Sequence, residues 1–169
     1  MIEYRDGGLD DGAVLGGIAR ATFIDTFGPL YSLANLEGFL TTTSDAAYAA
    51  ELADPAVEVR FAEVGGSPVG FCKVGPLKLP ASDAAAGAIE LRQLYVFKPW
   101  QGVGVAAVLT DWALGRARAR GAPELWLSVF TDNARARKFY ARYGFEEVAP
   151  YAFMVGDQAD EDILCRVRL

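Results

Sequence analysis

The chain has 169 residues, of which 52% are hydrophobic and 22% charged, and this suits one globular domain over residues 1–169 with a sizeable core. The net charge of −6 argues against nucleic acid and anionic membranes as partners, and no apolar run reaches the roughly 18 residues of a membrane span. There is no histidine, which excludes Ser-His-Asp and Cys-His nucleophiles and histidine-ligated metals.

The two cysteines, Cys72 and Cys165, fall in strand-like runs and lack the spacing of a metal site. We interpret them as small buried hydrophobic residues in a reducing cytoplasm. The first six residues are charged at once and lack the apolar stretch of a signal peptide, which agrees with a cytoplasmic location. No metal cofactor is expected.

The first third of the chain predicts a short strand at 2–5 and then three helices, which end near Phe27, Leu40 and Leu52. From residue 57 the apolar period changes to two, which indicates strands. The elements predicted beyond this point are a hairpin at 57–64 and 69–74, a strand at 88–97, a helix at 105–121, a strand at 125–130, a helix at 133–143, and strands at 145–155 and 163–169. This order indicates an α+β protein whose mixed, mostly antiparallel sheet has helices on its faces.

The strand at 88–97 contains an irregularity in its apolar pattern. Apolar residues fall at 89 and 91 and then at 94 and 96, so the parity changes across Arg92-Gln93. A β-bulge there would keep all four on one face and leave backbone groups free to bind an extended ligand. A tolerated polar residue on an edge strand is an equally good interpretation.

Two glycines, Gly102 and Gly104, come just before the helix at 105–121. Such a turn presents successive backbone N–H groups and the positive helix end to a phosphate or pyrophosphate, although many helices start with a glycine for a tight turn alone. Residues 98–142 carry 8 basic and 3 acidic groups, a balance of +5, whereas the rest of the chain is at −11. A basic segment in an acidic chain favours one compact anionic ligand.

Two classes of nucleotide-binding protein fit less well. The P-loop pattern is absent. Gly102-x-Gly104-x-x-Ala107 satisfies the dinucleotide fingerprint formally, but four residues separate it from the strand and no acidic residue ends the next strand. An NAD-dependent oxidoreductase is therefore disfavoured.

The stretch Leu94-Tyr95-Val96, followed by Gln101 to Ala106, resembles the GNAT superfamily of acyl-CoA-dependent N-acyltransferases, whose [QR]xxGx[GA] signature matches Gln101, Gly104 and Ala106. The resemblance continues through 125–129, 133–140 and Tyr143-Gly144-Phe145, so it covers residues 88–146. Residues 23–31 and 151–156 look, more loosely, like the polyamine-acetylating branch. The resemblance implies a twisted sheet of about seven strands with helices on both faces and a splayed fourth and fifth strand.

The resemblance also implies an acetyl-CoA site. The splayed strand would bind pantetheine and the glycine turn the pyrophosphate. Asn133 would hydrogen-bond the pantetheine arm, and Arg137 or Lys138 would meet the adenosine phosphates. The implied cofactor-binding residues are Leu94, Tyr95, Val96, Gln101, Gly102, Val103, Gly104, Val105, Ala106, Asn133, Arg137, Lys138 and Tyr140.

For catalysis, Tyr140 is similar to the family's general acid, which protonates the leaving thiolate, although helical spacing also suits it to the core. Glu90 is the predicted base, directly or through water, and a solvated carboxylate paired with Arg92 is an equal alternative. Phe27, Tyr31 and Phe39 fall in the first helical region, which walls the acceptor pocket in relatives, and core or an aromatic lid is an equal alternative for them. Glu90 is also predicted to bind the substrate.

The acidic remainder of the chain favours a small cationic amine as acceptor. A non-catalytic CoA-binding module of the same fold is the alternative function, and a homodimer is expected by analogy.

Overall fold

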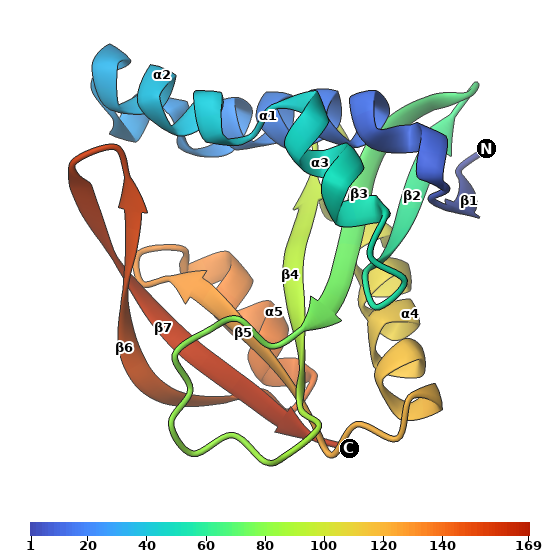
Figure 1. The fold of residues 1–169 in the computed structure, drawn as a ribbon, viewed down its shortest axis with the longest axis vertical. Coiled ribbons are helices and arrows are strands. Elements are labelled where there is room, and N and C mark those ends of the chain that lie inside the picture. Colours follow the sequence, from blue (N-terminus) through green and yellow to red (C-terminus); the bar gives the residue numbers. More distant parts are fainter.

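The computed structural model describes residues 1–169 and places all strands in one sheet with the order β1-β2-β3-β4-β5-β7-β6 (Figure 1). The strands are β1 (Glu3–Asp6), β2 (Glu58–Val64), β3 (Ser67–Pro76), β4 (Ile89–Val96), β5 (Glu124–Phe130), β6 (Glu146–Val155) and β7 (Gln158–Arg168). The helices are α1 (Gly12–Phe27), α2 (Leu33–Thr42), α3 (Asp45–Leu52), α4 (Val105–Ala119) and α5 (Ala134–Arg142), with 3-10 turns η1 (Leu9–Asp11), η2 (Gly28–Leu30) and η3 (Lys98–Trp100).

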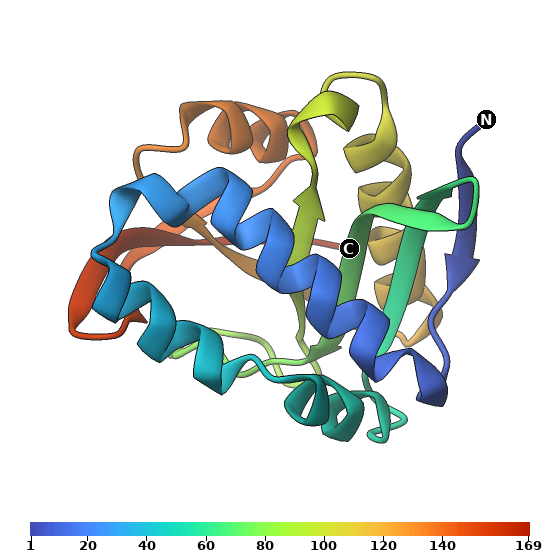
Figure 2. The same ribbon diagram turned by 90° about the horizontal axis from the view of Figure 1, so that it is seen from above.

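Helices cover both faces of this sheet, as the sequence predicts. Leu15 and Ile18 of α1 and Tyr48 of α3 pack against Phe61 and Phe71 on one face. On the other face, α4 and α5 close the larger core, whose fully buried members include Leu109, Leu125 and Cys72. Figure 2 shows α1 lying across the sheet, with α2 near the turn between β6 and β7. The fold-class prediction is confirmed.

Local sequence explains where the helices begin. The Ser32 and Ser44 side chains accept hydrogen bonds from the third residues of α2 and α3, Asn35 and Ala47, both at 3.2 Å. Both cysteines are free and buried, as predicted. None of the helices has the length and apolar character that crossing a bilayer requires.

The parity change in β4 is a bulge, which confirms the structural interpretation. Gln93 pairs with Lys73 and Leu91 with Val74, so Arg92 is the extra residue without a partner on β3. The bulge keeps Ile89 and Leu91 on the same face as the apolar residues that follow it. β4 pairs with β5, its only parallel neighbour, at just two positions, from Ile89 to Glu90, and the strands then separate.

The last strand is longer than the sequence predicts. It begins at Gln158 rather than Ile163, because β6 pairs with it from the turn onward and β5 joins at Asp162. The residues before Ile163 are mostly acidic and have low β-propensity, and cross-strand pairing overrides that preference. As a result Asp160 and Asp162 lie on a strand, and each is only 8% exposed.

Candidate active site

The splay between β4 and β5 opens into a cavity of about 480 Å³. Its wall is formed by the ends of the two strands, the C-terminal part of α1, the start of α4 and one side of α5. Most of the predicted site residues line it: Phe27, Tyr31, Leu94, Tyr95, Val96, Gln101, Gly102, Gly104, Ala106, Asn133 and Tyr140. The sequence therefore identified the residues that meet at one place in the fold.

One side of the cavity is the free edge of β4. The Phe97 N–H donates to the Val69 carbonyl of β3 at 3.0 Å. Because consecutive residues of a strand direct their backbone groups to opposite sides, the N–H groups of Leu94 and Val96 point toward the gap beside β5. The Val96 carbonyl accepts the Gln101 side-chain amide at 2.8 Å. Three backbone groups of this edge are thus available to a ligand: the N–H of Val96, and the N–H and the carbonyl of Leu94.

The glycine turn adds a row of donors next to this edge. The Gln101 N–H donates to Lys98 and the Val108 N–H donates to Gly104, but no N–H from 102 to 107 donates to a backbone carbonyl. Gly102 and Gly104 have φ of +83° and +96°, which only glycine adopts without strain. These N–H groups and the N-terminus of α4 form a concave site for an anion. The Val103 side chain is exposed and Val105 is buried in the core, so these two can contribute only their amides.

The basic residues on α5 divide into two groups. Arg135 lines the cavity and donates to the Gln101 side chain at 2.7 Å. Arg137 instead forms an ion pair with Glu147 at 2.8 Å, and Lys138 is exposed and outside the cavity wall. The sequence named Arg137 or Lys138 as candidate ligands of the adenosine phosphates, and it did not name Arg135. Since helical periodicity does not show which side of α5 faces the glycine turn, the sequence could not distinguish among them.

Asn133 and Tyr140 mark the two ends of α5. Asn133 caps the helix by accepting the Ala136 N–H at 3.1 Å and also lines the cavity. Tyr140 is 9% exposed and packs against Phe145 with ring centroids 5.6 Å apart, yet it too lines the cavity. Burial raises the pKa of the Tyr140 hydroxyl, so this group is a neutral proton donor at physiological pH.

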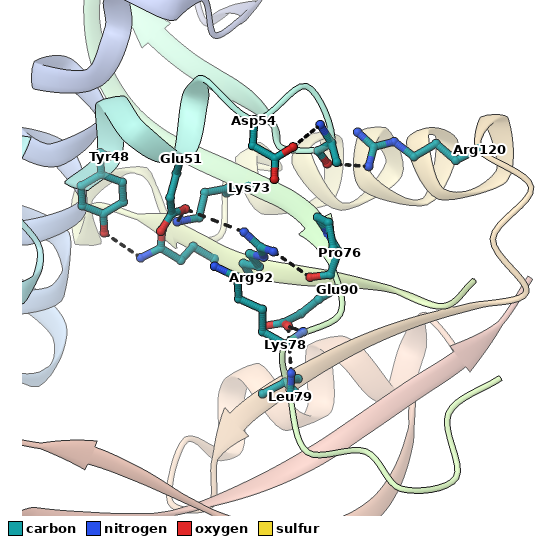
Figure 3. A network of polar contacts seen from close by, with 12 residues as sticks. Tyr48, Glu51, Asp54, Lys73, Pro76, Lys78, Leu79, Glu90, Arg92 and Arg120 are labelled. Carbon is teal, nitrogen blue, oxygen red and sulfur yellow. Dashed lines mark hydrogen bonds and ion pairs between the residues drawn. The ribbon is translucent and has the colours of Figure 1, made fainter. Parts of the chain in front are cut away.

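Glu90, the predicted base, lies at the edge of a second cavity of about 250 Å³, beside Lys73. Its Oε2 accepts the backbone N–H groups of Lys78 at 2.8 Å and Leu79 at 3.2 Å (Figure 3). Burial raises the pKa of the Glu90 carboxyl, and these two hydrogen bonds act in the opposite direction. The structure therefore gives Glu90 a role in holding the connection between β3 and β4.

The bulge itself is held by polar contacts (Figure 3). The Arg92 guanidinium donates to the Pro76 carbonyl at 2.7 Å and lies 4.0 Å from the Glu51 carboxylate. The neighbouring Gln93 donates to the Tyr48 hydroxyl at 3.0 Å. These contacts fix the bulge from the α3 side and keep β4 bent away from β5.

Aromatic side chains line the opposite end of the large cavity. Phe27 packs edge-on against Phe130 and Tyr95, with ring centroids 6.3 Å and 6.4 Å apart. Phe23 stacks on Tyr31 at 5.8 Å. Phe27 and Tyr31, the predicted acceptor-site residues, therefore both line the cavity at this aromatic end.

Two carboxylates at this end were not anticipated from the sequence. The Tyr31 hydroxyl donates to Asp160, and Asp162 lines the cavity. Burial raises the pKa of Asp162 to about 6, with Ser128 hydrogen bonding in the opposite direction and the Asp160 charge adding to the rise. The spacing of two acidic residues at i and i+2 was the available signal, but it has meaning only once residues 158–162 are recognised as a strand.

Residues 24–145 match the sequence profile described as the acetyltransferase (GNAT) family, which covers most of the chain. The chain belongs to the GNAT family. An uncharacterised N-acetyltransferase of Lactobacillus delbrueckii subsp. lactis is 29% identical over 90% of this chain and 88% of its own length. A mycothiol acetyltransferase of Beutenbergia cavernae is 46% identical over a shorter stretch, 45% of this chain and 24% of its own length.

A GNAT-like fold is also found in the solved structures. The PaiA N-acetyltransferase of Thermoplasma acidophilum, determined in complex with coenzyme A, superposes with a TM-score of 0.79 at 20% identity and covers 100% of this chain and 99% of its own. The predictions of a GNAT fold and of an acetyltransferase are confirmed.

Proposed function

We propose that this GNAT protein transfers an acetyl group from acetyl-CoA directly to the primary amine of a small cationic acceptor. The observation that carries the proposal is the combination of an opened β4 edge with a row of unengaged N–H groups at residues 102–107. A pantetheine arm can add to the edge as an extra strand, and the turn can bind a pyrophosphate. This arrangement fits a long thiol-bearing nucleotide better than a compact anion.

The residues around the cavity supply the remaining chemistry. Leu94 and Val96 would bind the arm, and the amides from Gly102 to Ala106 the pyrophosphate. Asn133 lies beside the path of the arm. Arg135 fits the phosphates better than the predicted Arg137 and Lys138, because it borders the glycine turn.

Catalysis requires a donor for the thiolate and an acceptor for the amine proton. Tyr140 is placed to protonate the leaving sulfur, because its hydroxyl is neutral and it lines the cavity. Attack by the amine on the thioester carbonyl needs no covalent enzyme intermediate. The loss of the amine proton falls to a carboxylate: Glu90 would act through water, and Asp162 is in the cavity itself.

Two measurements test this function. Acetyl-CoA at a hundredfold excess over its dissociation constant should stabilise the protein by about 2.7 kcal/mol in thermal unfolding, whereas NAD(H) should not. Thiol release should then be followed with a panel of primary amines. The absence of a shift with acetyl-CoA would refute the cofactor, and silence across the panel would favour the non-catalytic CoA-binding module. A homodimer and a cytoplasmic location stay predictions of the sequence.

A further inference from the structure

One face of β7 carries two buried carboxylates, and one of them, Asp162, lines the large cavity at its aromatic end. Asp160 and Asp162 are two residues apart on β7, so their side chains share a face, and each is 8% exposed. Across the ladders, Asp160 lies opposite Phe153 of β6 and Asp162 opposite Phe130 of β5. Both phenylalanines line the cavity together with Asp162. Each carboxylate therefore has an aromatic ring directly beside it.

The protein supplies no cation to these carboxylates. Asp160 accepts hydrogen bonds from Tyr31 and, at 2.9 Å, from Gln158, both uncharged. Neither aspartate takes part in an ion pair. A carboxylate removed from water without a counter-ion is unfavourable, so a ligand cation would supply the missing charge.

The three arginines of the cavity wall are engaged elsewhere. Arg92 donates to Pro76, and Arg135 donates to Gln101. Arg142 lies over the Phe139 ring at 5.8 Å. No arginine of the cavity wall pairs with Asp162, and one of the three, Arg135, borders the glycine turn.

We infer that Asp162 is the acceptor-recognition and proton-accepting residue of this enzyme, and that the Asp160–Asp162 face with its aromatic walls binds a primary ammonium group carried on an apolar chain. This inference rests on the proposed acetyl transfer. Phe130 and Phe153 add cation–π attraction, and Phe27 offers apolar area for the chain of the acceptor.

The proton transfers balance as follows. One ammonium proton passes to the Asp162 carboxylate, and the neutral amine attacks the thioester carbonyl. The C–N bond forms, the C–S bond breaks, and the thiolate takes the proton of the Tyr140 hydroxyl. The second proton of the new amide nitrogen leaves through water and restores the Tyr140 hydroxyl, while Asp162 returns its proton to solvent. The products are the acetamide, the free thiol and one released proton.

The groups around Asp162 determine its response to pH. Asp160 on the same strand, Tyr151 on β6, Tyr95 on β4 and Tyr31 after η2 all face it, and none is a cation. The enzyme should therefore lose kcat/KM as the pH falls through about 6, where Asp162 takes up a proton. It should also lose kcat/KM at alkaline pH, where the acceptor ceases to be an ammonium ion.

The binding test uses hexyltrimethylammonium, which carries the charge and chain but has no proton to transfer, with 1-hexanol as the uncharged control. Calorimetric titration at pH 8 in the presence of coenzyme A should show binding of the cation to the wild type and at least about tenfold weaker binding to Asp162→Asn. The matched variant Glu161→Gln removes the same charge from an exposed position of β7 and should bind like the wild type. Equal affinity in Asp162→Asn, or no binding to the wild type, overturns the inference.

The kinetic test uses hexylamine as acceptor and distinguishes Asp162 from Glu90 as the group that accepts the amine proton. Asp162→Asn should lower kcat/KM by about 10² at pH 8 and remove the acid limb. Ser128→Ala should move that limb to higher pH, because it removes a hydrogen bond that stabilises the carboxylate. Loss of the limb in Glu90→Gln, with the limb retained in Asp162→Asn, would overturn the inference in favour of Glu90. Failure of acetyl-CoA to stabilise the protein while the cation still binds through Asp162 would refute the proposed function and leave the cation site intact.

Discussion

The hydroxyl of Tyr140 is the group that we propose as the proton donor to the leaving thiolate. Tyr140→Phe removes it and keeps the ring that packs against Phe145, so the fold and the acetyl-CoA site should persist. We expect kcat to fall by about 10², in the range of general-acid catalysis, while the thermal shift with acetyl-CoA is unchanged. Tyr143→Phe is the matched control, since Tyr143 is not part of the cavity wall and its hydroxyl makes a 3.3 Å hydrogen bond to the Ala107 carbonyl. Equal turnover in the two variants would show that Tyr140 is not the general acid.

Gly104 shows how one backbone conformation links stability to the proposed cofactor site. Gly104→Ala meets no neighbouring atom within 4 Å, so its effect comes from the φ of +96°. We expect a loss of about 1 kcal/mol in unfolding free energy and weaker binding of acetyl-CoA. Gly115→Ala, in the middle of α4 with open space around it, should instead gain about 0.5–1 kcal/mol and bind acetyl-CoA normally. Both substitutions add one methyl group. Changes of opposite sign in the unfolding free energy, measured by urea titration, would therefore show that the backbone conformation of Gly104 causes its effect. Changes of the same sign would contradict this.

At the scale of elements, patterning predicts most of this fold because local and tertiary preferences agree. The change from a period of 3.6 to a period of two at residue 57 marks the hairpin, and the parity slip at Arg92 marks the bulge. Both signals arise from side chains that must reach one core. The beginning of β7 lacked such a signal, because Asp160 and Asp162 are buried although they are acidic, and Asp162 faces a cavity rather than a core.

The same reasoning explains which parts of the site were missed. The glycine turn and Tyr140 carry a family pattern, and they lie where that pattern implies. Arg135 and Ser128 depend on which side of an element faces the cavity, and this is decided by packing between segments distant in sequence. The family resemblance pointed to Phe27 and Tyr31 for the acceptor pocket but gave no signal for Asp162.

α2 packs on the β6–β7 turn, directly before the part of β7 that carries Asp160 and Asp162 (Figure 2). The Asp157 N–H donates to the Asn35 side chain at 3.1 Å, and a Cβ on Gly156 would come within 2.8 Å of the Asn35 Cα. Gly156→Ala therefore carries two penalties, the φ of +58° and a clash with backbone. It should unfold at a lower urea concentration than the wild type and raise KM for the amine without changing acetyl-CoA binding.

Gly65→Ala is the matched control for this contact. Gly65 has nearly the same φ, +57°, but a Cβ added there would have no neighbouring atom within 4 Å. The difference between the two variants in unfolding free energy reports the α2 contact alone, and we expect it to be about 1–3 kcal/mol. Identical values would show that α2 is not held by the turn.

At the scale of the whole molecule, the net charge of −6 should favour the approach of the proposed cationic acceptor. Arg135 beside the glycine turn should favour an anionic nucleotide there. Because surface fields are screened over about 8 Å at physiological ionic strength, added salt should raise KM for the amine more than it changes kcat.

The free energy of unfolding of the whole protein should depend on pH, because Asp162 is a carboxylate in an apolar site. Burial raises the pKa of Asp162 from 3.8 to about 6. Between these two pH values, Asp162 is therefore protonated in the folded state and ionised in the unfolded state. The favourable contribution of protonated Asp162 to the free energy of unfolding is present below pH 4 and disappears as the pH rises through 6. Without ligand, Asp162→Asn should therefore be more stable than the wild type at pH 8, on the order of 1–3 kcal/mol, and the difference should shrink steadily toward pH 4.5 in thermal unfolding. The exposed variant Glu161→Gln should follow the wild-type curve, and a pH-independent difference for Asp162→Asn would show that its carboxylate carries no such penalty.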